Sequence, residues 1–175
     1  MKNSLIALII LGVVIAITFF AIGGLEGNNG ETDLSSNDGK SFNEKLEAAK
    51  SLNKKIVVSV YTDWCGWCKK MDRETFKNES VISEIVRNFI FIKLNAESSE
   101  ELTYQGEKYT KVQFAAAFGI KGYPATIFLN SSSDPITVVP GYIDGDMFTK
   151  ILKFISSEAY LNQTFEKFIE EGKQN

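Results

Sequence analysis

The sequence predicts an α/β domain in which helices cover both faces of a mixed β-sheet. Two short runs of β-branched and aromatic residues, IVVSVY and FIFIKLN, have the character of buried central strands. Helical patterns separate them, and two more strand-like runs, ATIFLN and ITVVP, are joined by the turn SSSDP. A strand–helix–strand unit followed by a hairpin and a final helix predicts a mixed sheet covered on both faces.

The first 23 residues are interpreted as a signal peptide or an N-terminal membrane anchor. An apolar run from Leu5 to Ile22 follows Lys2. It is longer than the roughly 7–15 residues of a signal-peptide core and close to the roughly 20 that span a bilayer, although Ala21 and Gly23 offer a weak cleavage site. The less favoured alternative is a buried helix of the domain. The positive charge before the run and the acids after it place the remainder outside the cytoplasm.

Residues 24–40 are rich in Gly, Asn, Ser and Asp and are expected to form a flexible linker, so that the folded domain spans residues 41–175. Its first helix is expected to begin at Ser41, which forms a capping box with Glu44. The polar stretch 96–110 shows no clear periodicity and is expected to be a solvated excursion or a partner-contacting loop. The C-terminal stretch, capped at Asp144 or Asp146, is expected to form one long helix or two packed pieces.

Composition excludes several classes of function. A net charge of -3 with no basic cluster gives no reason to expect nucleic acid as a partner. The chain contains no histidine, which removes His-based acid–base catalysis, a Cys–His dyad and the commonest metal ligand. Chemistry must therefore use Cys, carboxylates, Lys, Tyr or the backbone.

The chain has two cysteines, Cys65 and Cys68, separated by Gly66 and Trp67. A zinc site needs about four ligands, and one cysteine pair without histidine does not supply them. A structural disulfide across so short a loop would constrain little of the unfolded chain. The favoured interpretation is a redox-active dithiol. Cys65 lies where a strand ends and a helix begins, so the helix N-terminus favours its thiolate, and Cys68 one turn later is placed to resolve a mixed disulfide.

Four stretches in the same order resemble the thioredoxin family over roughly residues 41–154. DWCGWCKKM is similar to the family's active-site stretch, FIKLN to the strand that carries a lysine, FGIKGYPATIFL to the cis-proline loop, and PGYIDGDMFTKIL to the last strand and helix. The resemblance implies a thioredoxin fold, with Cys65 as nucleophile and Cys68 as resolving thiol. The apolar N-terminus makes the chain most similar to membrane-tethered or periplasmic bacterial members.

The resemblance also implies a substrate groove, in which a cis bond at Pro124 keeps a backbone edge open for a substrate strand. A trans loop proline is the alternative. Trp64 is expected to pack beside the helix start or to fill the core, and Trp67 is expected to be exposed. The groove positions are Gly122, Tyr123, Pro124 and Gly141, and the supporting positions are Trp64, Gly66, Trp67, Lys93, Tyr123 and Pro124.

The sequence departs from the family pattern beneath the cysteines. Thioredoxins carry a buried Asp six positions before the first cysteine, where this chain has Ser59. Resolution must then rely on water, Lys93 or Asp63, although a solvated charge or a cap is the simpler role for Asp63. Lys93 either favours the thiolate by charge attraction or extends to solvent from a strand edge. Gly-Trp between the cysteines replaces the Gly-Pro of thioredoxins.

These observations predict a thiol-disulfide oxidoreductase of the extracytoplasmic space that reduces disulfides in exported proteins. It requires no cofactor or metal, and the resemblance implies a membrane redox partner that returns its electrons. Two alternatives stay open: an oxidant or isomerase of the same fold, and a non-catalytic adapter or chaperone that binds partners in the Tyr123–Pro124 groove. Replacing Cys65 with Ser separates catalysis from simple binding.

Overall fold

The computed structural model describes residue 34 and residues 39–173. The predicted signal or anchor (1–23) and most of the predicted linker (24–40) lie outside these residues. The boundaries between them stay predictions. Within the described part of the chain, no helix is both long enough and apolar enough to cross a membrane.

The core of the domain is a four-stranded mixed sheet, as the sequence predicts. Its strands are β1 (Lys55–Tyr61), β2 (Phe89–Asn95), β5 (Ala125–Leu129) and β6 (Pro135–Pro140), in the order β2-β1-β5-β6. β1 runs parallel to β2 and antiparallel to β5, and β5 pairs with β6 as an antiparallel hairpin. The parallel pair is joined through helices and the antiparallel pair through a short turn, which are the usual connections for each type.

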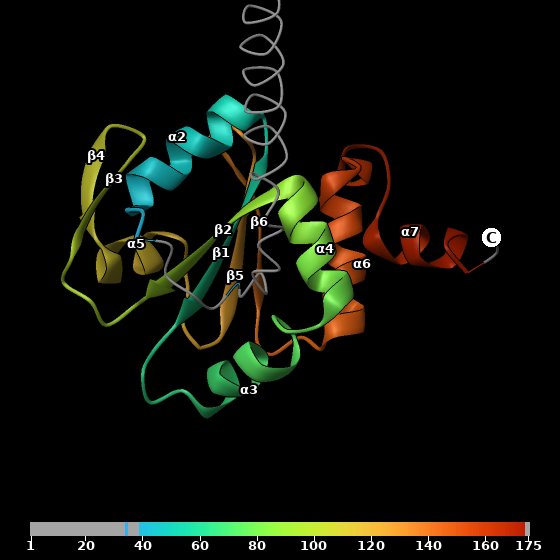
Figure 1. Cartoon of the computed structure of the whole chain (residues 1–175), viewed down its shortest axis with the longest axis horizontal. Helices are drawn as coiled ribbons and strands as arrows, with labels where there is room; N and C mark the ends of the chain where they lie inside the picture. Colours follow the sequence, from blue (N-terminus) through green and yellow to red (C-terminus); the bar gives the residue numbers. More distant parts are fainter. Residues whose placement is uncertain (1–33, 35–38, 174–175) are drawn as a thin grey trace, which may run out of the picture. The chain divides into compact units, whose positions relative to one another are not determined.

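One face of the sheet is covered by α2 (Phe42–Leu52), α5 (Lys111–Ala117) and a second, two-stranded sheet. These elements lie to the left of the sheet in Figure 1. The predicted capping box is confirmed, because the Ser41 hydroxyl accepts the Glu44 N–H and the Glu44 carboxylate accepts the Ser41 N–H. Phe114 of α5 is fully buried at the centre of this cluster.

The other face is covered by α3 (Gly66–Glu74), α4 (Glu79–Asn88) and α6 (Gly145–Ser156), with α4 and α6 side by side (Figure 1). The predicted cap of the last long helix is confirmed at Asp144, whose carboxylate accepts the Met147 N–H. Because successive side chains of β1 alternate between the two buried faces, this strand has almost no polar position, which explains its continuous β-branched run.

Residues 96–110 are not a solvated excursion. They contain an antiparallel hairpin, β3 (Glu101–Tyr104) and β4 (Glu107–Thr110), and the alternative of a partner-contacting segment stays a prediction. Leu102 and Tyr104 are buried in the core cluster with α2 and α5. The hairpin is part of the fold because alternate residues of β3 point inward, while its charged residues keep the outer side in water.

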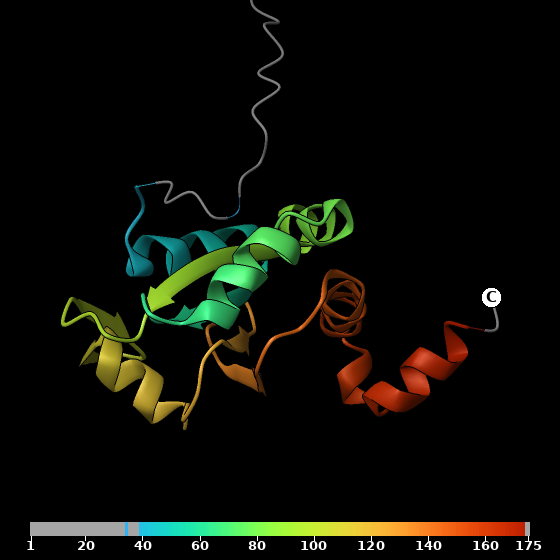
Figure 2. The same ribbon diagram turned by 90° about the horizontal axis from the view of Figure 1, so that it is seen from below.

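The C-terminal stretch forms separate pieces, as one of the two expectations states. After α6 come the short 3-10 helix η1 (Ala159–Leu161) and α7 (Phe165–Glu171). The rings of Phe165 and Phe168 each lie 5.3 Å from that of Phe154 on α6. Figure 2 shows α7 beyond α6, away from the sheet. It is therefore an added helix that attaches through aromatic contacts.

Candidate active site

The cysteine pair lies at the junction between the end of β1 and the start of α3. Cys65 is the N-cap residue of α3, and Gly66 is the first residue of the helix. Cys65 and Cys68 form a disulfide with Cα atoms 5.3 Å apart, and the Cys68 N–H donates to Cys65 Sγ at 3.0 Å. The N-cap sulfur thus takes the place of the usual capping oxygen. In the reduced protein this N–H and the helix N-terminus would stabilise negative charge on Cys65.

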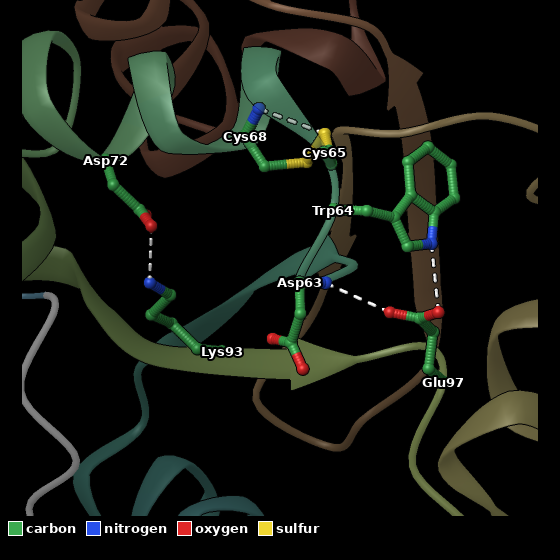
Figure 3. The surroundings of a disulfide bond; sticks show 7 residues. All are labelled: Asp63, Trp64, Cys65, Cys68, Asp72, Lys93 and Glu97. Atoms are coloured by element: carbon green, nitrogen blue, oxygen red, sulfur yellow. Dashed lines mark hydrogen bonds and ion pairs between the residues drawn. A yellow bond between two sulfur atoms is a disulfide. The ribbon is translucent and has the colours of Figure 1, made fainter.

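The disulfide is buried while the tryptophans beside it are exposed. Both cysteines are 4% exposed, whereas Trp64 is 69% and Trp67 58% exposed. The expected exposure of Trp67 is confirmed, and core filling by Trp64 is wrong, because the indole lies on the outside of the domain next to the disulfide (Figure 3). Exposed indoles around a buried reactive group indicate a contact surface for a partner.

Glu97 fixes the backbone and the indole just before Cys65. Its carboxylate accepts the Asp63 N–H at 3.0 Å and the Trp64 indole N–H at 2.9 Å (Figure 3). Asn95 completes the arrangement, since its side chain donates to the Asp63 carboxylate and accepts the Glu97 N–H. Asp63 therefore serves as a hydrogen-bond partner on the loop. The bond from Glu97 was not predicted, because nothing in a polar stretch indicates which carboxylate reaches back to the cysteine loop.

Trp67 belongs to an aromatic cluster on the other side of the pair. Its ring lies 5.4 Å from that of Tyr142, and the Lys70 ammonium lies over both rings, 5.1 and 4.8 Å from their centroids. The Tyr142 hydroxyl donates to Glu74 at 2.9 Å, and this hydrogen bond is the main reason that the pKa of Tyr142 is raised. Trp67 is thus held at the surface by packing between α3 and the loop that follows β6.

The loop before β5 lies beside the cysteines, as the resemblance implies. The Tyr123–Pro124 bond is cis, so the trans alternative is wrong. The Tyr123 ring packs edge-on against Trp64 with centroids 6.1 Å apart, which places this loop next to the residue before Cys65. The Gly141 N–H donates to the Pro124 carbonyl at 2.8 Å, and Gly141 has a φ of +85°, a conformation that suits glycine.

A hollow of about 430 Å³ lies along this loop and the end of β6. Its lining includes all four residues assigned to the groove from the sequence: Gly122, Tyr123, Pro124 and Gly141. A concave surface of this kind has room for an extended peptide.

Beneath α3, Lys93 forms an ion pair with Asp72 and not with a residue at position 59. The Lys93 ammonium lies 2.7 Å from the Asp72 carboxylate (Figure 3). It also lies over the Tyr61 ring, 5.0 Å from the centroid. Ser59 faces Lys93 across the β1–β2 pairing and is 3% exposed. Burial, followed by the charges of Asp63 and Asp72, raises the pKa of Tyr61.

Asp72 was not singled out in the sequence, although its position four residues after Cys68 was a usable signal. Residues four apart share a helix face, so the Asp72 carboxylate projects from the same side of α3 as the resolving cysteine. The ion pair thus joins a strand, β2, to the helix that begins at the cysteines, α3.

No group of three or more His, Cys, Asp or Glu residues capable of holding a metal ion occurs within residues 39–173 or at residue 34. Both cysteine sulfurs are already bonded to each other.

Comparison with known proteins assigns the family. The chain belongs to the thioredoxin-like family, because the family model described as "Thioredoxin-like domain" matches residues 42–156. An uncharacterized protein of Caenorhabditis elegans is 33% identical over 94 residues, which are 54% of this chain and 12% of that protein. The thiol:disulfide interchange protein DsbD of Pseudoalteromonas atlantica is 26% identical over 116 residues, 65% of this chain and 18% of that protein. The chain thus matches only a small part of these curated relatives.

Solved structures show the same fold. A thioredoxin-fold protein from Helicobacter pylori superposes with a TM-score of 0.59 at 18% identity, covering 70% of this chain and 82% of that one. The α/β architecture predicted from the sequence, a mixed sheet with helices on both faces, is therefore the thioredoxin fold.

Proposed function

We propose that this protein is a thiol-disulfide oxidoreductase that reduces disulfides in exported proteins through its Cys65–Cys68 couple. The observation that carries the proposal is the reactive pair itself, with Cys65 at the N-cap of α3 and accepting the Cys68 N–H. Its similarity to part of a thiol:disulfide interchange protein supports the same chemistry.

Reduction of a substrate proceeds in two exchanges. The Cys65 thiolate attacks one sulfur of the substrate disulfide, and the other substrate sulfur leaves as a thiolate that takes a proton from solvent. Cys68 then loses its proton and attacks Cys65 Sγ, which releases the second substrate sulfur as a thiolate. Two electrons have passed to the substrate, and the protein is left with the Cys65–Cys68 disulfide seen in the structure.

The aromatic residues around the cysteines and the cis-proline groove bind the substrate in this cycle. Trp64, Trp67 and Tyr123 frame the entry to the buried sulfurs, and the groove along Pro124 and Gly141 receives the substrate backbone. These aromatic side chains provide the large contact area that partner binding uses.

The proton of Cys68 leaves from the face of α3 that also carries Asp72. We assign the role of proton acceptor to this carboxylate, which Lys93 holds at 2.7 Å, because Ser59 has no carboxylate to fill it. The positive charge of Lys93 offsets the negative charge of Asp72. The carboxylate therefore does not disfavour the Cys68 thiolate on the same helix face.

The reductive direction and the location rest on separate features. Between β2 and β5 the chain has only the β3–β4 hairpin and the seven-residue helix α5, in place of the large helical insertion of dedicated oxidants. The apolar run from Leu5 to Ile22 after Lys2 supports an extracytoplasmic domain, anchored or secreted. A membrane dithiol carrier would then reduce the protein after each turnover.

The test is reduction of insulin disulfides by dithiothreitol in the presence of the full chain. We expect the wild-type protein to accelerate the reaction and Cys65→Ser to abolish the acceleration. In a separate reaction freed of dithiothreitol, reduced Cys68→Ser should trap mixed disulfides with insulin, because the resolving thiol is missing. Activity retained by Cys65→Ser would refute the mechanism, and a wild-type protein that binds insulin without accelerating its reduction would favour the adapter alternative.

A further inference from the structure

An apolar groove lies between β6, α6 and α7, outside the cis-proline hollow. It has a volume of about 520 Å³, and its walls include Val139 of β6, Met147 and Ile151 of α6, and Phe165 of α7. This volume falls within the roughly 300–1,000 Å³ of ligand-binding clefts.

The outer wall of the groove comes from residues beyond the family match. Phe165 follows residue 156, where the match to the thioredoxin-like family ends. Its ring is held 5.3 Å from that of Phe154, so α7 is fixed beside α6 by aromatic packing. The added helix thus turns one side of a common fold into a groove.

The groove is continuous with the reactive face through Tyr142. This residue lines the groove, and its ring also packs against Trp67, which lies between the two cysteines. The Tyr142 hydroxyl is fixed by Glu74. A polypeptide chain that passes over Tyr142 can therefore contact the groove and the cysteine pair at the same time.

The residues that line the groove favour the binding of apolar side chains of a polypeptide. Asp144 is the one charged residue of the lining, and its carboxylate already accepts the Met147 N–H as a helix cap at 2.8 Å. Charged or amide side chains would lose hydration there without gaining partners. Met147 is 39% exposed, and the flexible thioether side chain adapts to different apolar partners.

We propose that this groove binds an apolar segment of the disulfide-bearing substrate polypeptide and so selects substrates whose cysteine has apolar residues nearby. The inference rests on the proposed function and adds a substrate class to it. A second copy of the chain is a poorer occupant, because an isologous dimer needs a self-complementary surface and two facing hollows leave a void.

The test uses two extended peptides, each with one cysteine in a mixed disulfide with glutathione. One carries leucines three to six residues on both sides of the cysteine, and the other carries asparagines there. The full chain is reduced, freed of reductant and mixed with each peptide, and its oxidation is followed by the fluorescence of its two tryptophans. We expect the leucine peptide to react about tenfold faster, as one or two buried side chains can provide.

Met147→Lys and Thr137→Lys place charge in the groove and should remove this preference while the rate with the asparagine peptide is kept. Thr137 also lines the groove, on β6. Val86→Lys is the matched control, because Val86 is 48% exposed on α4, outside the groove, and should keep the preference.

Equal wild-type rates with the two peptides would overturn the inference and leave the proposed function standing. A preference that survives both groove variants would also overturn it. A dimer in sedimentation equilibrium that Met147→Lys dissociates would assign the groove to a second copy instead. No reaction with either peptide would refute the proposed function, and the inference would fall with it.

Discussion

Replacing Lys93 with Met should lower the fraction of Cys68 that is present as thiolate. Lys93 balances the Asp72 carboxylate at 2.7 Å, and Asp72 lies one helical turn after Cys68. Without the cation, an unbalanced negative charge remains on the helix face that also carries the resolving thiol. A neighbouring negative charge disfavours the thiolate.

The size of the effect follows from the geometry. Side chains four apart on a helix are about 6 Å from each other, and two unit charges at that distance interact by about 0.7 kcal/mol in water and about 3 kcal/mol at an effective dielectric of 20. The Lys93 and Asp72 side chains are 22% and 28% exposed, so solvent screens part of this interaction. We expect about 1 kcal/mol, or roughly a fivefold loss of thiolate at neutral pH.

The assay is the pH dependence of iodoacetamide alkylation of Cys68 in the full chain carrying Cys65→Ser, so that the profile reports on the resolving thiol alone, and each further substitution is made in this background. Lys93→Met should move the midpoint of the profile to higher pH, and Asp72→Asn should move it to lower pH. Lys50→Met removes an exposed lysine of α2 and serves as the matched control. A Lys93→Met profile that overlays the profile of Cys65→Ser alone would show that the ion pair does not influence Cys68.

Two further predictions concern stability. Phe114→Ala should lower the free energy of unfolding in urea by about 3–5 kcal/mol, because Phe114 is fully buried. Val112→Ala, at a 44% exposed position, should change it little, and similar losses in both would argue against the assigned core. Burial, with smaller effects of Asp134 and Tyr109, raises the pKa of Tyr104 from 10.0 to about 12. The stability that the neutral Tyr104 hydroxyl contributes is therefore complete below pH 10 and should be lost as the pH rises toward 12. Tyr104→Phe should make the plot of unfolding free energy against pH flatter over this range.

The sheet and the cysteine site could be predicted because their signals are local. The β-branched run of β1, the Ser41 capping box and the Asp144 cap each depend on residues within a few positions of one another. The position of Cys65 at a strand–helix junction follows from the same local patterns. Local patterns of this kind fix element type before any tertiary contact is known.

The β3–β4 hairpin was missed because its pattern is short and its composition polar. Leu102 and Tyr104 alternate with outward residues for only one strand of four positions. A two-residue turn of Gln105 and Gly106, with φ values of 50° and 84°, joins the strands, and this is the conformation of a tight hairpin turn. Gln-Gly is a weaker hairpin signal than Asn-Gly, so the turn did not outweigh the surrounding charges.

The partners of the site residues could not be read from the sequence for a different reason. The ion pair of Lys93 with Asp72, the bond from Trp64 to Glu97 and the contact of Trp67 with Tyr142 join residues that are far apart in the sequence. Several carboxylates and aromatic rings compete for each role, and only the three-dimensional arrangement of the elements selects among them.

The most direct test is the reduction potential of the Cys65–Cys68 couple in the full chain, equilibrated with glutathione redox buffers. The chain has no other cysteine, and its two tryptophans flank or separate the pair, so thiol content and fluorescence both report on this one disulfide. We expect a potential near that of thioredoxin, about -270 mV, as a reductant requires. A potential near about -120 mV would identify an oxidant and contradict the reductive role proposed for the site.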